Sequence, residues 1–303
     1  MSQDLPIAVA CRLDKSDALD LTRKIVDYLL EKNVKISLEN RIAQRFNPHL
    51  RKDLRHMDEN SVKLIISVGG DGTILRIAGN LPRNPAPLFG INIGSVGFLD
   101  EYDCSGESED LIYKVLDRII AGDYFVESSM RLSAVCNRKR LQNALNEVYI
   151  VSSKPSKVLH VSIKIDNVLL NTAYLDGVLI STQAGSTAYS LSAGGSLVDP
   201  RLKIIQIVPV NPFARTGGIN PIIIPSTSEV EIELLRPKLN ALVVIDGQQE
   251  YHAYPRSIIK IRNADSNIKF VRLKKDFKSL YYEKLREKIL TGVKIPREDS
   301  PEE

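Results

Sequence analysis

The sequence predicts an α/β first domain with a doubly wound, mostly parallel sheet, followed by an all-β, sandwich-like second domain. Three observations support this fold class. The 303 residues exceed the usual size of a single hydrophobic core. Strand and helix patterns alternate over about the first 125 residues. Short strand patterns separated by turn residues then take over from about residue 127.

In the first domain, predicted at 1–125, short apolar runs alternate with amphipathic helical patterns. The runs suited to buried strands are Pro6–Ala10, Val34–Leu38, Val62–Val68 and Leu88–Ile93. Apolar residues at helical spacing predict one helix between Ala18 and Leu30 and another between Leu111 and Ile120. Gly122 is expected to end the second helix. This alternation predicts a parallel sheet that binds ligands at the carboxyl ends of its strands.

The second domain, predicted at 126–273, consists of short strand-like runs with turn signals such as Asp166-Asn167 and Asp246-Gly247 between them. The runs are Ser129–Cys136, Ala144–Val151, Val158–Ile165, Gly177–Ser181, Ile204–Pro209, Ile222–Ile224, Val230–Leu234, Ala241–Ile245 and Ser257–Ile261. Their spacing of about 8–12 residues is typical of a sandwich or curled sheet. A helix at 274–292 is predicted to pack back on the first domain, and the polar tail at 293–303 is expected to be disordered.

Composition excludes several functional classes. The chain has 41 Lys and Arg against 37 Asp and Glu, and the resulting net charge of +4 is too small to indicate nucleic-acid binding. No apolar stretch approaches the ~20 residues of a membrane span, and no signal-peptide pattern opens the chain. Cys11, Cys104 and Cys136 match neither a disulfide framework nor a zinc pattern. We therefore expect a cytoplasmic protein without nucleic-acid or membrane partners.

The most informative segment is the turn Gly69-Gly-Asp-Gly-Thr73, which follows a predicted strand and precedes a helical pattern. Backbone N–H groups at a helix N-terminus bind phosphate, and glycines allow a ligand to approach the backbone closely. The carboxylate of Asp71 gives no help to a phosphate site. Asp71 is either a helix cap, or a general base or Mg²⁺ organiser beside a bound nucleoside triphosphate.

Two further segments are unusually polar. Asp176–Gly195 combines Ser, Thr, Gly and Ala with one aromatic residue, Tyr189, which suits a ligand with many hydroxyl groups. A plain loop is the alternative. Asn146 and Glu147 lie side by side in a strand-like run, so they face opposite sides of the strand. A ligand, a turn or a bulge would each account for that pair.

Several common catalytic motifs are missing from the sequence. There is no Gly-x-x-x-x-Gly-Lys-Ser/Thr loop, no Gly-x-Gly-x-x-Gly, no His-Glu-x-x-His and no Gly-x-Ser-x-Gly. P-loop enzymes, dinucleotide-fingerprint enzymes and hydrolases with a serine triad are therefore not favoured.

The Gly69–Thr73 turn resembles the phosphate-binding signature of a kinase superfamily that includes NAD kinases, diacylglycerol and sphingosine kinases and, more distantly, phosphofructokinases. Three further segments resemble NAD kinases specifically, in the same order and spacing: Gly90–Leu99, Asn146-Glu147 and Asp176–Gly195. The resemblance runs from about Ile7 to Leu290 and points to the ATP-NAD kinase family, of archaeal type. It implies transfer of the γ-phosphoryl of ATP, or of polyphosphate, to the 2′-hydroxyl of the adenosine ribose of NAD, which gives NADP.

The resemblance also assigns roles to residues. It makes Asp71 the base that takes the proton of the 2′-hydroxyl. It places the ATP phosphates at Gly69, Gly70, Gly72 and Thr73. It assigns NAD to Asp71, Gly72, Leu75, Phe98, Asn146, Glu147, Lys157, Asp176, Thr187, Ala188, Tyr189, Ser190, Leu191, Ser192 and Gln248. Within that set, Asn146 and Glu147 would meet ribose hydroxyls and Asp176 the nicotinamide end. Tyr174 stands where the family often has a basic residue, so the resemblance gives no phosphate contact there.

The family resemblance further implies Mg²⁺, or another divalent cation, held mainly by the ATP phosphates with no protein ligand assigned. The strand edges of the β domain need protection by pairing, so we expect a homo-oligomer, either a dimer or a tetramer. A lipid kinase with the same glycine turn is an alternative, although 187–195 is too polar for an acyl chain. A dinucleotide sensor without catalysis is another. Incubation with ATP, Mg²⁺ and NAD separates these possibilities.

Overall fold

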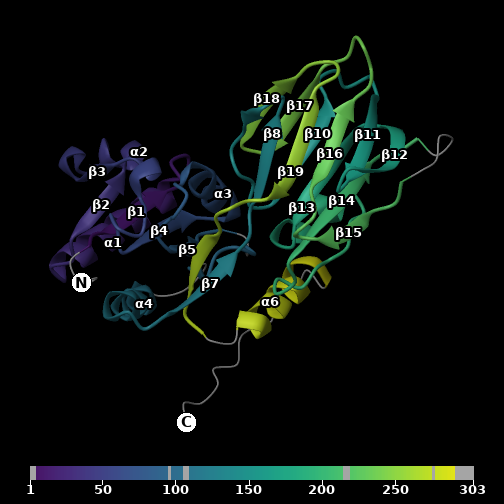
Figure 1. Cartoon of the computed structure of the whole chain (residues 1–303). Helices are drawn as coiled ribbons and strands as arrows, with labels where there is room; N and C mark the ends of the chain where they lie inside the picture. The colour runs from purple at the N-terminus through teal and green to yellow at the C-terminus, as the bar shows by residue number, and fades with distance from the viewer. Residues whose placement is uncertain (1–4, 95–96, 105–108, 214–218, 275–276, 291–303) are drawn as a thin grey trace.

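The computed structural model describes residues 5–94, 97–104, 109–213, 219–274 and 277–290. The predicted tail at 293–303 lies outside these residues, as do 275–276 and 291–292 of the predicted terminal helix. The described chain forms an α/β domain and a β-sandwich, and a helix near the C-terminus lies below the sandwich in the view of Figure 1. The predicted fold class is confirmed.

One sheet of eight strands organises the α/β domain, in the order β3-β2-β1-β4-β5-β20-β7, with β6 alongside β5. The strands are β1 (Ile7–Cys11), β2 (Ile36–Glu39), β3 (Arg51–Lys52), β4 (Leu64–Gly69), β5 (Leu88–Asn92), β6 (Tyr102–Asp103), β7 (Phe125–Ser129) and β20 (Ile268–Arg272). Every pairing in this sheet is parallel except that of β7 with β20. The carboxyl ends of β1, β4 and β5 therefore meet at one edge, where β4 leads into the glycine turn.

Helices cover both faces of this sheet, as a doubly wound fold requires. They are α1 (Ser16–Glu31), α2 (Asn40–Ala43), α3 (Asp71–Asn80) and α4 (Glu109–Ala121), with 3-10 turns at Pro48–Leu50 and Leu54–His56. Adjacent residues of a strand face opposite sides. Ile66 accordingly packs in the core that includes Leu29 of α1 and Leu116 of α4, and Ile65 in the core of α3. Asn33, in the left-handed region at φ 58°, follows the end of α1.

Two six-stranded sheets form the second domain, in the orders β15-β14-β13-β10-β17-β18 and β12-β11-β16-β19-β8-β9. The strands of the first are β10 (Glu147–Ser152), β13 (Gly177–Thr182), β14 (Ile204–Val210), β15 (Ile222–Pro225), β17 (Ala241–Ile245) and β18 (Gln249–Ala253). Those of the second are β8 (Leu132–Cys136), β9 (Lys139–Arg140), β11 (Leu159–Ile165), β12 (Val168–Leu175), β16 (Val230–Leu234) and β19 (Ile258–Asn263). Their inward side chains share one buried cluster, so this domain is a β-sandwich.

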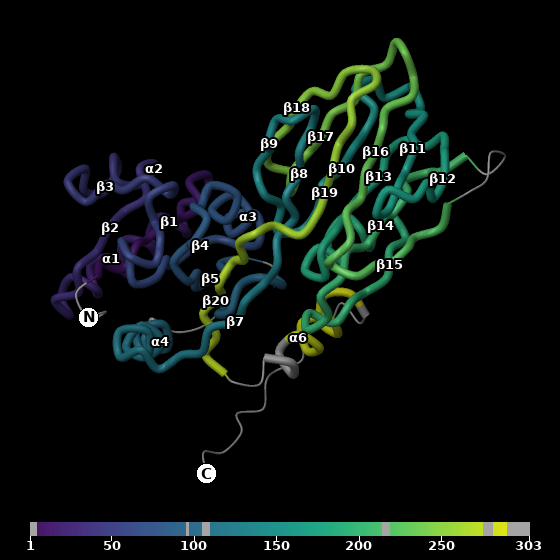
Figure 2. Tube along the Cα trace, viewed as in Figure 1, coloured from purple at the N-terminus to yellow at the C-terminus, as the bar shows by residue number. Residues whose placement is uncertain are grey.

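The chain passes between the domains twice, from β7 to β8 and from β19 back to β20 (Figure 2). Both β7 and β20 pair in the first sheet, although most of each lies in the range 126–273 predicted to be all-β. The domain limits drawn from the sequence stay a prediction. Neither strand has the long apolar run that marks the other core strands, and β7 is largely exposed.

The terminal helix α6 (Phe277–Leu285) continues into a π-helical turn, η5 (Arg286–Leu290). The Tyr281 hydroxyl donates to the carbonyl of Val198 (3.0 Å), which belongs to the sandwich. Lys284 Nζ donates to the carbonyl of Asp100, in the loop after β5. The helix thus packs back onto both domains. No helix in the described part of the chain has the length and apolar character needed to span a membrane.

Candidate active site

The glycine turn joins the last residue of β4 to the first turn of α3. Gly70 is the N-cap of α3 and Asp71 its first residue. A Cβ on Gly69 would lie 2.2 Å from Oγ1 of Thr73, so only glycine fits there. A Cβ on Gly72 would meet nothing within 4 Å, which leaves the backbone of the helix N-terminus open to a ligand.

The carboxylate of Asp71 does not cap its own helix. Its Oδ2 accepts the N–H of Phe98 and its Oδ1 accepts the N–H of Leu99, each at 2.9 Å. The side chain stays 28% exposed. A carboxylate oxygen accepts more than one hydrogen bond, so Asp71 can hold this loop and still accept a bond from a ligand hydroxyl.

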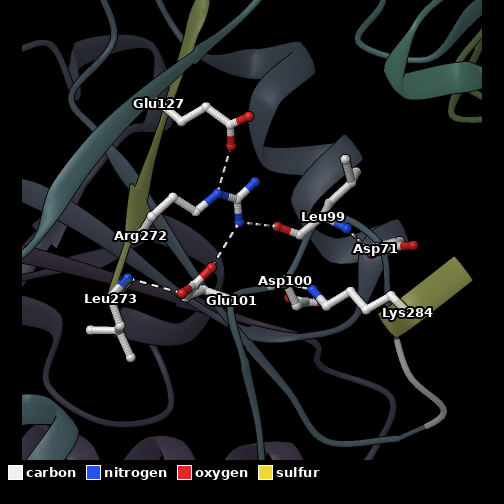
Figure 3. A network of polar contacts seen from close by, with 8 residues as sticks. All are labelled: Asp71, Leu99, Asp100, Glu101, Glu127, Arg272, Leu273 and Lys284. Atoms are coloured by element: carbon white, nitrogen blue, oxygen red, sulfur yellow. Dashed lines mark hydrogen bonds and ion pairs between the residues drawn. The ribbon is translucent and has the colours of Figure 1, made fainter. Parts of the chain in front are cut away.

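The loop that binds Asp71 is also held from the other side by Arg272 of β20 (Figure 3). Arg272 Nη1 donates to the carbonyl of Leu99 (3.3 Å) and to Glu101 Oε2 (3.2 Å). Its Nε donates to Glu127 Oε2 at 2.6 Å. Glu101 Oε1 also accepts the N–H of Leu273 at 2.9 Å. The candidate base is therefore tied through this loop to β20, whose Arg272 lies 173 residues from Leu99 and 171 from Glu101 in the sequence.

Behind Asp71 lies a second carboxyl group, that of Asp100. Both of its oxygens are buried without a hydrogen-bond partner among the described residues. A Cβ on Gly97 would lie 2.5 Å from both Asp100 Oδ2 and Asp71 Oδ1, so the two carboxyl groups converge there. Burial, followed by the negative charge of Asp71, raises the pKa of Asp100 to about 7. Burial, followed by the positive charge of Arg272, lowers the pKa of the neighbouring Lys284 to about 8.

A hollow of about 580 Å³ opens in front of the glycine turn. All five residues of Gly69–Thr73 line it, together with Asn92, Gly94 and Gly97 of the neighbouring loop. Basic side chains line it as well: Arg12, Lys15, Arg41, Arg76 and Lys288. Asp14 brings one further carboxylate, ion-paired to Arg12 at 2.7 Å. The combination of N–H groups, glycines and cations suits a ligand with several phosphates.

Asn146 and Glu147 lie at the start of β10, on the sandwich. The side chain of Asp246 accepts the backbone N–H groups of Leu145, Asn146 and Glu147, at 2.7 to 3.0 Å. Asn146 Oδ1 and Glu147 Oε2 are buried without a partner among the described residues. Burial, followed by the charge of Asp246, raises the pKa of Glu147 to about 8. Buried polar atoms of this kind are normally satisfied, and a ligand hydroxyl would satisfy them.

The hydroxyl-rich tract lies against the same end of the sandwich. Thr182 Oγ1 donates to the carbonyl of Leu145 (2.6 Å), and the N–H of Gly185 donates to Thr182 Oγ1 (3.1 Å). A Cβ on Gly185 would lie 2.2 Å from the carbonyl oxygen of Asn146, so glycine permits this close packing. The tract and the Asn146-Glu147 pair are therefore one structural unit.

The predicted dinucleotide residues in this tract differ in their surroundings. Ser190 is fully buried, and its hydroxyl accepts Nε2 of Gln206 at 2.6 Å. Tyr189 is exposed and packs edge-on against Tyr149 (5.2 Å between ring centroids). Ala188 and Leu191 are partly buried and Ser192 is exposed. Ser190 thus faces the interior, whereas Tyr189 and Ser192 are accessible to a ligand.

Asp176 lies at the other end of β13. Gly177 pairs with Val151 and Ser181 pairs with Glu147, which puts Asp176 about 17 Å along the strand from Ser181. Its Oδ2 accepts Nδ2 of Asn211 at 3.0 Å. Lys157 is exposed in the loop after β10, near this end. The ring of Tyr174 stacks on that of His160, with 4.0 Å between the ring centroids.

A second, smaller cavity of about 70 Å³ lies between the two domains. Phe98, Thr187, Gln183 and Tyr281 are among the residues that line it. Gln183 Oε1 is buried without a partner among the described residues. The cavity brings together two predicted dinucleotide residues, Phe98 and Thr187, from different domains.

Two predicted dinucleotide residues lie elsewhere. Leu75 is buried in the core beneath α3 and lines neither hollow. Gln248 projects from the β17–β18 turn into the larger hollow, on the side of the glycine turn. Both assignments to NAD stay predictions.

The sequence did not single out Arg272, Asp100, Lys284 or the five cations of the hollow, and it used Asp246 only as a turn signal. Asp246 lies in the left-handed region at φ 50°, as expected for the turn predicted at Asp246-Gly247. The contact with Asn146, however, joins residues 100 apart in the sequence. No cluster of three or more His, Cys, Asp or Glu suited to a metal occurs among the residues that the structure describes.

The fold and the site define a class: a two-domain protein that binds a phosphorylated ligand at a glycine-rich helix N-terminus, with an acidic residue at the same point. Residues 7–124 match the model of the ATP-NAD kinase N-terminal domain, and residues 145–273 match that of the ATP-NAD kinase C-terminal domain. This chain belongs to the ATP-NAD kinase family. The resemblance inferred from the motifs is confirmed.

Individual relatives agree with the family models. The NAD kinase of the archaeon Methanothermobacter thermautotrophicus is 36% identical over 289 residues, which cover 94% of this chain and 96% of that protein. The NAD kinase of Thermococcus gammatolerans is 34% identical, with 92% and 98% covered.

Solved structures also match. An NAD kinase from Archaeoglobus fulgidus in complex with ATP has a TM-score of 0.71 at 29% identity, and covers 93% of this chain and 99% of its own. A yeast NADH kinase complexed with NADH has a TM-score of 0.79 at 21% identity, with 97% and 90% covered, and supports the fold.

Proposed function

We propose that this protein is an NAD kinase that transfers the γ-phosphoryl group of ATP to the 2′-hydroxyl of the adenosine ribose of NAD. One observation carries the proposal: Asp71 stands at the helix N-terminus that opens into a basic hollow of about 580 Å³. A phosphoryl donor in that hollow would place its phosphates beside the one acidic residue of the glycine turn.

The donor side is the basic hollow. Four cations from the α/β domain line it: Arg12, Lys15, Arg41 and Arg76. Arg76 is also paired with Glu39 (2.5 Å), which fixes the guanidinium in place. Phosphoryl transfer requires mainly positioning and neutralisation of charge, and both are available here. Polyphosphate would meet the same groups, so ATP and polyphosphate are both donors in this proposal.

The acceptor side is the start of β10. Asn146 Oδ1 and Glu147 Oε2 are buried acceptors that a pair of ribose hydroxyls would satisfy. Because the pKa of Glu147 is raised to about 8 by burial and by Asp246, its carboxyl group holds a proton at neutral pH and can donate as well as accept.

Asp71 would accept the proton of the 2′-hydroxyl as the new bond to phosphorus forms. Its two backbone contacts fix the direction of the carboxylate and leave a lone pair available on each oxygen. General-base assistance of this kind contributes about 10²–10⁴-fold. Asp71 would thus have two roles: it holds the loop at residues 98–99, and it accepts the proton of the 2′-hydroxyl.

We also propose that Mg²⁺, or another divalent cation, accompanies the donor and supplies charge neutralisation at the phosphates. The chemistry of the site fits this: Mg²⁺ commonly binds through substrate phosphates with one or two carboxylates. Asp71 and Asp14 are the carboxylates that line the described part of the hollow. Activity should therefore be lost on chelation with EDTA and return with added Mg²⁺.

A homo-oligomer, dimer or tetramer, is part of the proposal. Val168, Leu169 and Leu170 on the edge strand β12 are 69%, 58% and 41% exposed. An apolar edge strand is normally protected by pairing. We also propose a cytoplasmic location, supported by the buried thiols of Cys11 and Cys136, which carry no disulfide. Light scattering on the purified protein measures the subunit number.

The direct test is incubation with ATP, Mg²⁺ and NAD, with NADP detected by its enzymatic reduction. NADP formation supports the proposal. Binding of both nucleotides without turnover would instead indicate a sensor. Phosphorylation of diacylglycerol but not NAD would indicate a lipid kinase and contradict the proposal.

A further inference from the structure

Among the described residues that line the hollow, Lys288 is the one basic residue from the chain beyond residue 273, here called the C-terminal segment. It lies on η5, fifteen positions beyond residue 273, where the match to the family's C-terminal domain ends. Its Nζ is 3.8 Å from Oδ2 of Asp71 and 4.9 Å from the centroid of the Phe98 ring. The side chain is 38% exposed and borders the same hollow as the glycine turn.

The segment that carries Lys288 is fixed by contacts with both domains. Tyr281 donates to the carbonyl of Val198 (3.0 Å) and Tyr282 to Asp199 Oδ2 (2.7 Å), both on the sandwich. The buried Lys284 donates to the carbonyl of Asp100, on the α/β domain. Lys288 follows one helical turn after Lys284. Its position beside Asp71 is thus set by the packing of α6.

An ammonium group beside Asp71 is placed to contact the phosphoryl group that is transferred. If Asp71 accepts the proton of the acceptor hydroxyl, the phosphoryl group under attack must lie within a few Å of that carboxylate. Negative charge on the transferring phosphoryl oxygens is best stabilised by cations placed there beforehand. Four rotatable bonds let the Lys288 ammonium turn from Asp71 toward such an oxygen without moving the helix.

We propose that Lys288 is a catalytic residue that binds the transferring phosphoryl group, and that the C-terminal segment is thereby part of the active site. Before the nucleotides bind, its ammonium balances the charge of Asp71. With both substrates bound, it donates to a phosphoryl oxygen, and Asp71 is left to accept the hydroxyl proton. No bond to Lys288 forms or breaks. This inference rests on the proposed kinase activity.

The test compares steady-state NADP formation by the full-length protein and by Lys288→Ala, Lys288→Met and Lys288→Arg. Met keeps an unbranched stem against Phe98 and removes the charge, so it separates packing from electrostatics. Lys274→Ala is the control. Lys274 is an exposed cation just after β20, and it lines neither the larger hollow nor the smaller cavity. Thermal unfolding of each variant shows that it is folded.

We expect kcat to fall by about 10²-fold in both Lys288→Ala and Lys288→Met, with a smaller loss in Lys288→Arg and none in Lys274→Ala. The KM for NAD should stay within about threefold, because the contact is made to the phosphoryl group. Turnover within about threefold of wild type in folded Lys288→Met overturns the inference, as does an equal loss in Lys274→Ala. If the wild-type protein itself makes no NADP, it is the proposed function that fails.

Discussion

Asp71 and Arg272 hold one residue, Leu99, from opposite sides: Asp71 accepts its N–H at 2.9 Å, and Arg272 donates to its carbonyl at 3.3 Å. The carboxylate comes from the first turn of α3 and the guanidinium from β20. The loop after β5 is therefore fixed between the site and the strand that returns from the sandwich. A displacement of β20 would be transmitted to the contacts of the candidate base.

Replacement of Gly72 by Ala separates folding from ligand binding. A Cβ there meets no protein atom within 4 Å. Because alanine lowers the conformational entropy of the unfolded chain, Gly72→Ala should stabilise the protein by about 0.4–1 kcal/mol. The methyl group would, however, occupy the space before the helix N-terminus. We expect the KM for ATP to rise at least about tenfold, equivalent to about 1.4 kcal/mol.

Gly79→Ala is the matched control for that variant, because Gly79 lies near the other end of the same helix. There the three atoms nearest to a Cβ would all belong to the flexible side chain of Gln142, the nearest at 3.1 Å. Its KM for ATP should equal that of wild type. An unchanged KM in Gly72→Ala would show that the ligand does not approach the turn closely.

Asp100 should make stability depend on pH. Its pKa is raised in the folded protein to about 7, mainly by burial, from about 3.9 in the unfolded chain. The protonated carboxyl therefore contributes stability that is fully present below about pH 4 and is lost as pH rises through about 7. Asn cannot ionise, so Asp100→Asn should gain melting temperature relative to wild type between pH 4 and pH 8.

The measurement is thermal unfolding of wild type and Asp100→Asn across that range. Lys284, whose pKa burial lowers to about 8, loses the charge of Asp100 in the variant, so the comparison rests on the change between pH 4 and pH 7. A difference in melting temperature that is constant from pH 4 to pH 8 would mean that Asp100 does not titrate as its surroundings indicate.

Loss of Arg272 should destabilise the fold far more than loss of an exposed arginine. Its side chain is 10% exposed, and its partners Glu101 and Glu127 are 4% and 17% exposed. Arg272→Met would leave two carboxylates buried without their cation, at a cost of about 3–5 kcal/mol. Arg262→Ala removes an exposed pair with Asp265 and should cost at most about 1 kcal/mol. Urea unfolding of both variants measures the loss in free energy of unfolding for each. Equal losses would contradict the role of Arg272 as the cation of a buried ion-pair network.

The central strands, the helices on both faces and the glycine turn were predictable from the sequence because their signals are local. The apolar run before Gly69 and the helical pattern after Thr73 set the turn at the carboxyl edge of the sheet. The pairing of β20 with β5 and β7 was not predictable. Its five residues follow a series of hairpins, and nothing local distinguishes them from another sandwich strand.

Only some residues of the candidate site were predictable from the sequence. Asp71, Asn146 and Glu147 stood out because their polarity conflicts with their local pattern. Asp100, Arg272 and Lys288 did not stand out, because their roles depend on contacts between distant residues. The bonds of Arg272 reach Glu127, Glu101 and Leu99, which are 145, 171 and 173 residues away in the sequence. Lys288 is placed beside Asp71 by the packing of α6. The bond from Gln206 to the buried Ser190 hydroxyl likewise joins residues of different elements, 16 positions apart in the sequence.

The most direct test of the account is NADP formation by Asp71→Asn at saturating ATP, Mg²⁺ and NAD. The amide keeps one oxygen for the 98–99 loop but is a poor base, so we expect kcat to fall by about 10²–10⁴-fold. The measurement is made below the melting temperature of the variant, since one N–H of Phe98 or Leu99 loses its acceptor. A kcat equal to that of wild type would contradict the role of Asp71 in proton transfer.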